Sequence, residues 1–436
     1  MRIYFLLLFI SNLIFNSGCK KHMNEDIITL DIIAEKYVKL ALNTGQYDPD
    51  FIDAYYGPEE WNKTKHTAAE TDSIPFEELK WQATYLLMDL EALNVDTYDS
   101  IKVLRYRYLH NQIIAINTKL DMMAGDFLPF DVESRALYDA VTPHFDEAYY
   151  EGLLLDLEKL LPGTGSINKR YEEYSNSFII PPQLLDTVFN TAITEAKRRT
   201  SLFIELPANE RFKIEYVTDK PWSAYNWYKG NSFSIIQINT DLPIYIERAI
   251  DLACHEGYPG HHVYNMLLEK HLVDERNWTE FSVYLLFSPQ SLIAEGSANY
   301  GIEMVFPNEE RREYERNIIF PLAGIDPTKA DQYYDIIQVR NELSYAGNEA
   351  AMNYLNGQIS REDAVDWLMK YNLYNYERAL QRTFYFDRYR SYVINYNYGR
   401  DLIKNYIERN AGNNINKRWA LFKSILSTPL TASMLE

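Results

Sequence analysis

Eight consecutive residues carry side chains whose types and spacing could hold a metal ion and move a proton. Residues 255–262 read His-Glu-Gly-Tyr-Pro-Gly-His-His and contain three of the eight histidines in the chain. Imidazole nitrogens bind zinc, and the motif H-E-x-x-H places two histidines one helical turn apart, with a glutamate beside the catalytic water. The segment therefore predicts a zinc site in which His255 is a ligand and Glu256 is the general base.

The spacing alone does not decide which histidine is the second ligand. In an unbroken helix, His261 lies about 240° around the axis from His255, and His262 lies about 10 Å farther along it. Neither position lets two imidazoles share one zinc ion at about 2.0–2.1 Å. Pro259 and Gly260 resolve this, because proline removes a helical hydrogen bond and glycine accepts unusual dihedral angles, so that two residues can bulge out. We favour His261 as the ligand, with His262 as the alternative.

A third protein ligand is expected on the next helix. Residues 294–300 read Ala-Glu-Gly-Ser-Ala-Asn-Tyr, and Gly296 would let two helices approach closely. Two histidines and one glutamate leave a fourth position on zinc open. We therefore expect His255, His261 and Glu295 to hold Zn²⁺.

An α-rich chain must position these residues. Between residues 27 and 205, apolar side chains such as Ile33 and Tyr37 recur at three- and four-residue steps, as in amphipathic helices. Residues 212–217 alternate apolar and polar side chains, and residues 232–240 follow a Gly-Asn turn, so both segments are predicted strands. We expect a mainly α fold with a small β-sheet next to the zinc-binding helix.

Two predicted helices carry the motif residues. Asp241 can cap a helix that runs into His255, and another helix can begin at Ser288 and continue through Glu295. Because the strand 232–240 stands just before the first of these helices, its edge could bind an extended peptide as an added strand.

The N-terminus predicts export. One positive charge is followed by a short apolar stretch and by small residues before Cys19, which is typical of a secretory signal and resembles a bacterial lipobox. The predicted parts are a signal peptide (1–18) with Cys19 lipidated, a tether (19–26), an N-terminal helical subdomain (27–205) and a zinc-binding catalytic subdomain (206–436). We expect a lipoprotein of the bacterial cell envelope, held at the membrane by its lipid and facing the periplasm or the cell exterior.

The charge of the chain argues against nucleic acid as a partner. The net charge is −19, and the acidic residues are dispersed without a basic stripe between them. Such a surface repels phosphate backbones.

The sequence around the motif resembles a known family. The chain resembles the bacterial domain-of-unknown-function family eight-eight-five, whose hallmark is H-E-x-x-x-G-H-x-x-Q, although Tyr264 stands in place of the glutamine. Further segments that resemble the family are residues 53–58, 222–227, 239–243 and 295–300. In the last of these, Ser297 replaces the tryptophan of the family's E-G-W-A-x-Y. The family is similar to gluzincin metallopeptidases, which implies a large helical metallopeptidase-like fold and a zinc site of two histidines and a distant glutamate.

The tyrosine-rich C-terminal region offers groups that could contact a substrate. Peptide hydrolysis needs a hydrogen-bond donor for the oxyanion beside the metal. Residues 395–399 resemble the S-Y-x-x-G of the family, so Tyr396 is the predicted donor, with simple packing as the alternative. Arg388 or Arg390 could bind a substrate carboxylate through two hydrogen bonds.

Together these features predict an exported, lipid-anchored zinc-dependent peptidase that acts on a peptide or other amide substrate. One alternative is a zinc-dependent amidase that acts on non-peptide or cell-wall amides. Another is a non-catalytic peptide-binding lipoprotein, but the presence of Glu256 argues against it, because a metal held by His255, His261 and Glu295 does not need that carboxylate.

Overall fold

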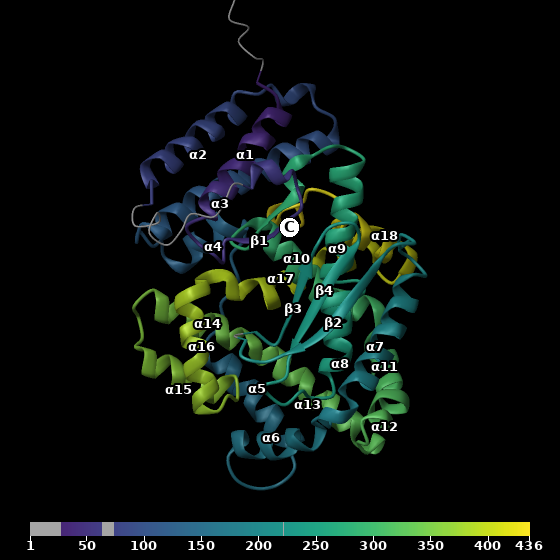
Figure 1. Ribbon diagram of the computed structural model, residues 1–436. Coiled ribbons are helices and arrows are strands. Elements are labelled where there is room, and N and C mark those ends of the chain that lie inside the picture. The colour runs from purple at the N-terminus through teal and green to yellow at the C-terminus, as the bar shows by residue number, and fades with distance from the viewer. Residues whose placement is uncertain (1–27, 63–73, 221) are drawn as a thin grey trace, which may run out of the picture.

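Helices dominate the computed structural model, which confirms the predicted mainly α fold (Figure 1). The structure describes residues 28–62, 74–220 and 222–436. The predicted signal peptide, Cys19 and the tether lie outside these residues. Within the described part of the chain, no helix combines the length and the apolar character needed to span a membrane.

Four helices form the N-terminal end of the molecule, at the top of Figure 1. They are α1 (Leu30–Thr44), α2 (Phe76–Glu91), α3 (Ser100–Met123) and α4 (Phe130–Tyr138). The stripe predicted from Ile33 and Tyr37 is confirmed, since both side chains are buried in α1. The side chains of Thr29 and Asp99 accept hydrogen bonds from the first turns of α1 and α3, which fixes where these two helices begin.

The remaining helices surround two long central ones, α10 and α17. The helices before the motif are α5 (Glu147–Leu160), α6 (Ile167–Ser175), α7 (Leu185–Thr200) and α8 (Arg248–Leu252). Those after the break in the motif are α9 (His261–Leu268), α10 (Pro289–Val305), α11 (Asn308–Tyr314), α12 (Phe320–Leu322), α13 (Ala330–Glu342), α14 (Ala346–Leu355), α15 (Arg361–Tyr371), α16 (Tyr376–Tyr389), α17 (Ile394–Ala411) and α18 (Ile415–Ile425).

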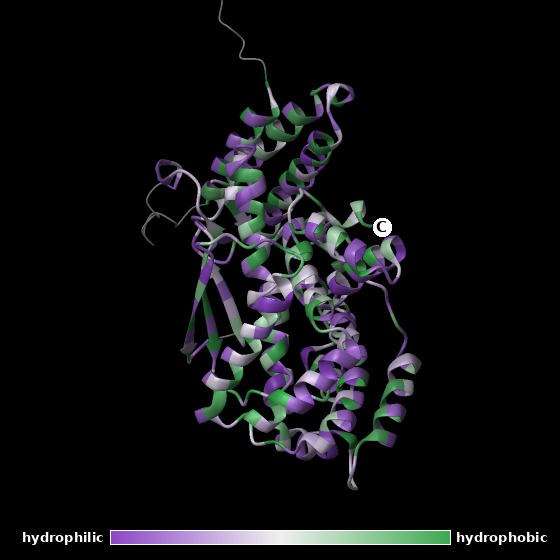
Figure 2. Ribbon diagram, turned by 90° about the vertical axis from the view of Figure 1, so that its right-hand side faces the viewer, coloured by the Kyte–Doolittle hydropathy of each residue, from purple (hydrophilic) through white to green (hydrophobic). Residues whose placement is uncertain are grey.

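Two small sheets accompany the helices. The strands β2 (Arg211–Val217), β3 (Ala224–Tyr228) and β4 (Phe233–Asn239) form one sheet in the order β2-β4-β3, with β4 parallel to β2 and antiparallel to β3. The other sheet pairs β1 (Ile52–Tyr55) with β5 (Val283–Leu285). In the turned view of Figure 2, the three-stranded sheet stands as a layer along one side of the helices.

The order of the strands corrects one prediction. The predicted strands at 212–217 and 232–240 are present as β2 and β4, but β4 lies in the centre of its sheet and has no free edge. The prediction that 232–240 offers an edge to a peptide is therefore wrong. The edge strand on that side is β3, which pairs only with β4 in the described part of the chain.

The helix α10 lies at the centre of the core and is buried around most of its circumference. It packs along α17, and the two backbones meet at Gly296 and Gly399. The expected close approach at Gly296 is thus present, but the partner is α17. One hydrophobic core contains residues from both sides of the predicted subdomain boundary at residue 206, and the boundary itself stays a prediction.

Candidate metal centre

The motif lies at a break between two helices. The helix α8 continues into a π-helical turn, Ala253–Gly257, that carries His255 and Glu256, and α9 starts again at His261. The expected cap at Asp241 is wrong, because α8 begins only at Arg248 and the Asp241 carboxylate instead accepts a hydrogen bond from the backbone of Asp219 at 2.7 Å.

The break is held by backbone contacts that admit only glycine at one position. The backbone N–H of Gly260 donates to the carbonyl oxygen of Cys254 at 2.9 Å, and the chain leaves no room for a Cβ atom there. The prediction that Pro259 and Gly260 interrupt the helical spacing is confirmed, although the result is a break between two helices. The break turns the chain so that the imidazole of His261 meets that of His255.

Three predicted ligands come together. The Nε2 atoms of His255 and His261 lie 3.1 Å apart, and Oε2 of Glu295 lies 3.4 Å from the first and 3.8 Å from the second. Ligands about 2.0–2.1 Å from a tetrahedral zinc ion are separated by about 3.3–3.4 Å. The three observed separations scatter around this value, so small shifts of the side chains would let the three atoms share one zinc ion. No other group of this kind with three or more members occurs in the described residues.

The hydrogen bonding of the cluster also favours a bound cation. Both Glu256 and Glu295 are buried, and the Oε2 atom of each has no hydrogen-bond partner within the described ranges. Two imidazole nitrogens facing each other at 3.1 Å need a proton or a metal ion between or beside them. A buried carboxylate oxygen without a partner is costly unless a cation compensates it.

The electrostatics of the cluster depend on burial. Burial lowers the pKa of His261 to about 4, although Glu295 opposes this effect. Burial, with a further contribution from Glu295, raises the pKa of Glu256 to about 7, while His255 and Arg248 act in the opposite direction. An imidazole that stays neutral can bind a metal, and a carboxyl group that titrates near neutrality is suited to accept and return a proton.

Side chains behind the ligands hold them in place, and two of them were missed in the sequence. The Oδ1 atom of Asn299 lies 3.2 Å from Nδ1 of His255, which leaves Nε2 free to face the cluster. The hydroxyl of Tyr392 donates to Oε1 of Glu295 at 2.8 Å. Asn299 stands one helical turn after Glu295, so the helical period could have indicated it, whereas Tyr392 comes from a distant segment.

The predicted oxyanion donor Tyr396 lies close to the cluster. Its hydroxyl is 3.4 Å from the hydroxyl of Tyr385, and its backbone carbonyl accepts a hydrogen bond from Asn299 at 3.2 Å. Burial raises the pKa of Tyr396 well above its ordinary value, so this phenol stays protonated and can donate. Its role toward an oxyanion stays a prediction.

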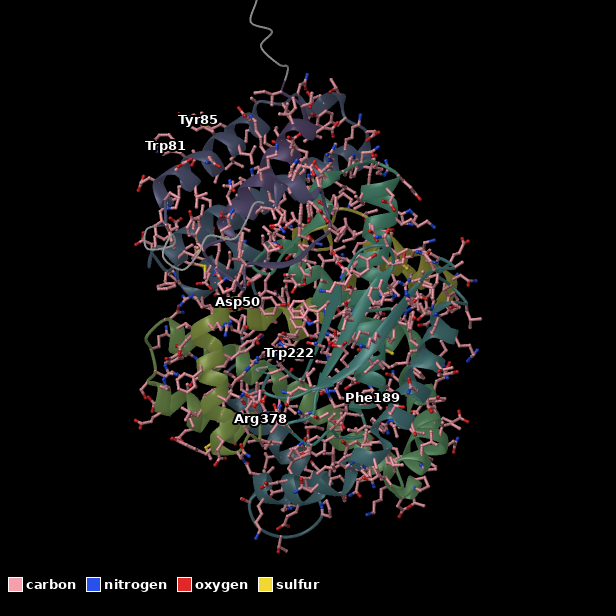
Figure 3. All side chains as sticks on the ribbon, in the orientation of Figure 1. Asp50, Trp81, Tyr85, Phe189, Trp222 and Arg378 are labelled. Carbon is pink, nitrogen blue, oxygen red and sulfur yellow. The ribbon has the colours of Figure 1, made fainter. Side chains whose placement is uncertain are left out.

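The two predicted substrate-binding arginines have carboxylate partners within the protein. Arg388 binds Asp50 through two hydrogen bonds of 2.5 and 2.7 Å, and Arg390 binds the buried Glu133 at 2.6 Å. Asp50, labelled in Figure 3, lies between the N-terminal helices and the helices around α14. The structure does not bring either arginine to the ligand cluster, and the substrate-binding role stays a prediction.

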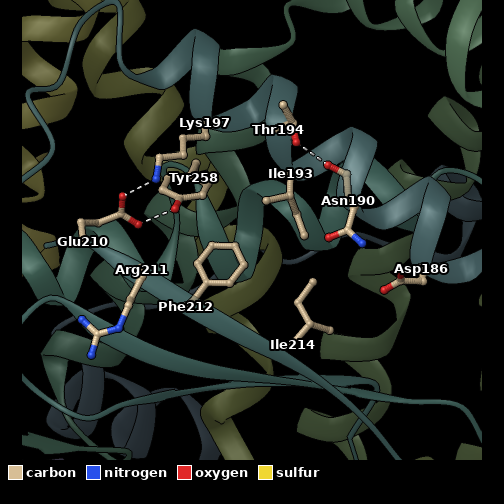
Figure 4. Close-up of a pocket in the computed structure, with 10 residues that line it drawn as sticks. All are labelled: Asp186, Asn190, Ile193, Thr194, Lys197, Glu210, Arg211, Phe212, Ile214 and Tyr258. Atoms are coloured by element: carbon tan, nitrogen blue, oxygen red, sulfur yellow. Dashed lines mark hydrogen bonds and ion pairs between the residues drawn. The ribbon is translucent and has the colours of Figure 1, made fainter. Parts of the chain in front are cut away.

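The alternative ligand His262 points away from the cluster. It is buried between Oγ of Ser234 and Oε1 of Glu210, at 2.8 Å from each. Figure 4 shows that Glu210 also binds Lys197 and Tyr258 at the rim of a cavity of about 490 Å³ between α7 and β2. The three candidate ligands do not line this cavity.

Comparisons with known proteins identify a related fold. No family model and no curated protein matches the chain, so the family resemblance stays a prediction. The fold is similar to a crystal structure described as "the putative lipoprotein from Colwellia psychrerythraea", with a TM-score of 0.52 and 12% sequence identity. The match covers 83% of this chain and 68% of the other. At this identity the likeness supports the fold alone.

Proposed function

We propose that this protein is a zinc-dependent peptidase. The observation that carries the proposal is the mutual spacing of His255, His261 and Glu295, which fits one tetrahedral zinc ion, with Glu256 beside it. When bound, zinc would polarise the scissile carbonyl and lower the pKa of water.

The residues around the cluster supply the proton transfers. Oε1 of Glu256 lies 4.0 Å from Nε2 of His255, so the carboxylate stands next to the position that water would take. It can accept the proton of that water and return it to the leaving amine. The backbone carbonyl of Glu256 accepts a hydrogen bond from Asn226 at 2.7 Å, which fixes this residue relative to β3.

The strand β3 supports a peptide as the substrate. The backbone carbonyl of Ser223 and the backbone N–H of Lys229 form hydrogen bonds with β4. Because the direction of the backbone groups alternates along a strand, those of Asn226 point to the opposite, free edge of β3. An extended peptide can add to such an edge as a further strand. Because Asn226 also binds Glu256, a peptide on this edge would lie next to the proposed general base.

The proposal also places the protein in the bacterial cell envelope. Cys19 follows Ser17 and Gly18 after a short apolar stretch, the arrangement of a lipidation site. The structurally similar protein, described as "the putative lipoprotein from Colwellia psychrerythraea", agrees with this location. We therefore infer a lipid anchor at Cys19 and a substrate outside the cytoplasm.

The test compares the full-length protein with its Glu256→Gln variant. Zinc content is measured in both by atomic absorption, and hydrolysis is followed with a mixture of unmodified peptides and with non-peptide amides. We expect one zinc ion per chain in both proteins and peptide cleavage only in the first. Glu256→Gln is nearly isosteric, so it separates proton transfer from metal binding.

The remaining outcomes each change the proposal. A protein that binds zinc and cleaves only non-peptide amides is an amidase. One that binds zinc and cleaves neither is a binding protein. Absence of zinc from both forms would mean that the three ligands are wrongly assigned.

A further inference from the structure

A third carboxyl group, that of Asp53, lies near enough to Glu295 and Glu256 for their charges to act on it. It belongs to β1, where the pairing with β5 shifts between Ile52 and Ala54, so Asp53 is the extra residue of a β-bulge. Bulges redirect a side chain and occur often beside active sites. The strand β5 leads within a few residues into α10, the helix that carries Glu295.

Asp53 contacts β3 through the side chain of Tyr225. The hydroxyl of Tyr225 in β3 donates a hydrogen bond to Oδ1 of Asp53. Because Tyr225 and Asn226 are adjacent, the same strand touches both Asp53 and Glu256. Asp53 is partly buried.

No cation within the described residues neutralises Asp53. Its partner there is the Tyr225 hydroxyl, and no lysine, arginine or histidine forms an ion pair with it. Burial raises the pKa of Asp53 to about 8, and the charges of Glu295 and Glu256 contribute, while the charge of Lys229 acts in the opposite direction. The buried Oε2 atom of Glu256 has no partner either. Without a positive group beside them, these two carboxyl groups are therefore costly to ionise, and a cation that binds there would stabilise their charged forms.

A bound zinc ion would stabilise the charged forms of the carboxylates nearest to it. Its two positive charges are offset once Glu295 and Glu256 are ionised, so Asp53 would still lack a positive partner. An ammonium group that arrives with the substrate would favour the ionised form of Asp53. The rings of Trp222 and Trp227 lie 5.6 and 4.6 Å from that of Tyr225, and the Nζ atom of Lys229 lies 5.3 Å from the centre of the Trp227 ring. The aromatic side chains beside Tyr225 thus already accept one cation.

We propose that Asp53 binds the ammonium group of a substrate that lies along β3, and that the favoured ammonium is the free N-terminus of a peptide. This inference rests on the proposed function and names its substrate class. The charges of Glu256 and Glu295 act on Asp53, so the α-amino group of a first residue bound there would lie near the metal centre that its carbonyl faces. A lysine side chain would carry its ammonium several bonds farther away.

Binding can be measured apart from turnover in the Glu256→Gln background. The zinc-loaded, full-length variant is titrated by calorimetry with tetra-alanine, with N-acetylated tetra-alanine, and with N-acetylated Lys-Ala-Ala-Ala. We expect acetylation to weaken binding at least tenfold, since it removes a charge-assisted hydrogen bond. When Asp53→Asn is introduced into this variant, the affinity for the free peptide should fall to that for the acetylated peptide. Added Glu60→Gln, which removes an exposed carboxylate just after β1, should change neither.

The outcomes separate this inference from the proposed function. Equal affinity for free and acetylated tetra-alanine, with one zinc ion per chain, overturns the role of Asp53 and leaves the peptidase intact. Tight binding of the acetylated lysine peptide that depends on Asp53 keeps the ammonium site but assigns it to a side chain. If Asp53→Asn lowers the zinc content, the test uses Tyr225→Phe instead, because this variant keeps the Asp53 carboxylate. It should reduce the preference for the free over the acetylated peptide without abolishing it. A Tyr225→Phe protein with an unchanged preference would then count against the proposed geometry.

Discussion

Gly260 lies directly against the backbone of His255. A Cβ atom at position 260 would be 1.8 Å from the carbonyl oxygen of His255 and 2.5 Å from that of Cys254. Contacts this short with backbone atoms cannot be relieved by a side-chain rotation. The approach of these two residues brings His261 to His255 across six positions of sequence, so the proposed metal centre requires a residue without a side chain at position 260.

Gly260→Ala is therefore expected to abolish metal binding. The backbone would have to move by more than an ångström, which separates the two imidazoles and destabilises the fold by about 1–3 kcal/mol or more. Zinc content and thermal unfolding measure the two effects. The control is Gly152→Ala in α5, where no atom lies within 4 Å of the added Cβ. There the better helix propensity of alanine should be neutral or stabilising by up to about 1 kcal/mol. Full zinc content in Gly260→Ala would contradict this account.

The contact between α10 and α17 predicts which of two glycine substitutions destabilises the protein more. A Cβ atom at Gly296 would lie 2.4 Å from the backbone of Gly399, while one at Gly399 would lie 2.9 Å from the carbonyl of Leu292. Gly296→Ala should therefore lower the free energy of unfolding more than Gly399→Ala does, and each decrease should be on the order of 1–3 kcal/mol. Urea unfolding measures both. Gly347→Ala is the control, because its nearest atom is 3.8 Å away. The reverse order would show that the helices do not meet as described.

Two tyrosines near Glu295 should have separable effects. Tyr392→Phe removes the hydrogen bond to Oε1 of Glu295, and the loss of such a contact behind a metal ligand typically weakens metal binding 10- to 100-fold. Tyr396→Phe should leave zinc affinity nearly unchanged and, if its phenol binds the oxyanion, lower kcat by about 100- to 1000-fold. Competition with a chromophoric chelator gives the affinities, and peptide hydrolysis gives kcat. Loss of zinc in both variants would assign both tyrosines to ligand positioning.

Substitution of the two arginines should affect the stability of the protein to different extents. Arg390 pairs with Glu133, whose side chain is fully buried, whereas Arg388 is 53% exposed beside Asp50. Arg390→Met strands a buried carboxylate and should cost about 3–5 kcal/mol, while Arg388→Met should cost about 1 kcal/mol or less. Denaturant unfolding measures both. A higher KM in Arg388→Met with unchanged stability would support its predicted contact with substrate, and an unchanged KM would remove that prediction.

Much of the site could be predicted because its chemistry is local in sequence. His255, Glu256 and His261 lie within one octapeptide, and the proline-glycine pair between them indicates a break in the helix. Glu295 follows on the next predicted helix. These four positions depend on residue type and short spacing, which a single sequence displays.

The parts that could not be predicted depend on contacts between distant segments. The partner of Glu295 is Tyr392, almost one hundred positions away, and Gly296 meets Gly399 instead of the helix with His255. The strands β1 and β5 have four and three residues, too few for a readable alternation. The order β2-β4-β3 places the second predicted strand in the centre, and no pattern within that strand reveals its neighbours.

The carboxylate of Glu210, which binds His262 of the motif, should make the stability of the protein depend on pH in the acid range. Burial would raise its pKa, but hydrogen bonds from His262, Lys197 and Tyr258 outweigh burial and lower the pKa from the ordinary 4.5 to about 2. A carboxyl group with a lowered pKa stabilises the fold above its unfolded value, and this contribution is lost as the pH falls from about 4.5 to 2. We expect Glu210→Gln to destabilise the protein at pH 7 by an amount on the order of 3 kcal/mol. The difference from the unsubstituted protein should shrink steadily below pH 4.5, which urea unfolding at a series of pH values measures. Glu215→Gln, on the exposed side of β2, is the control and should show a much smaller difference at pH 7. A difference for Glu210→Gln that does not change between pH 7 and pH 3 would show that this carboxylate is not held in its charged form.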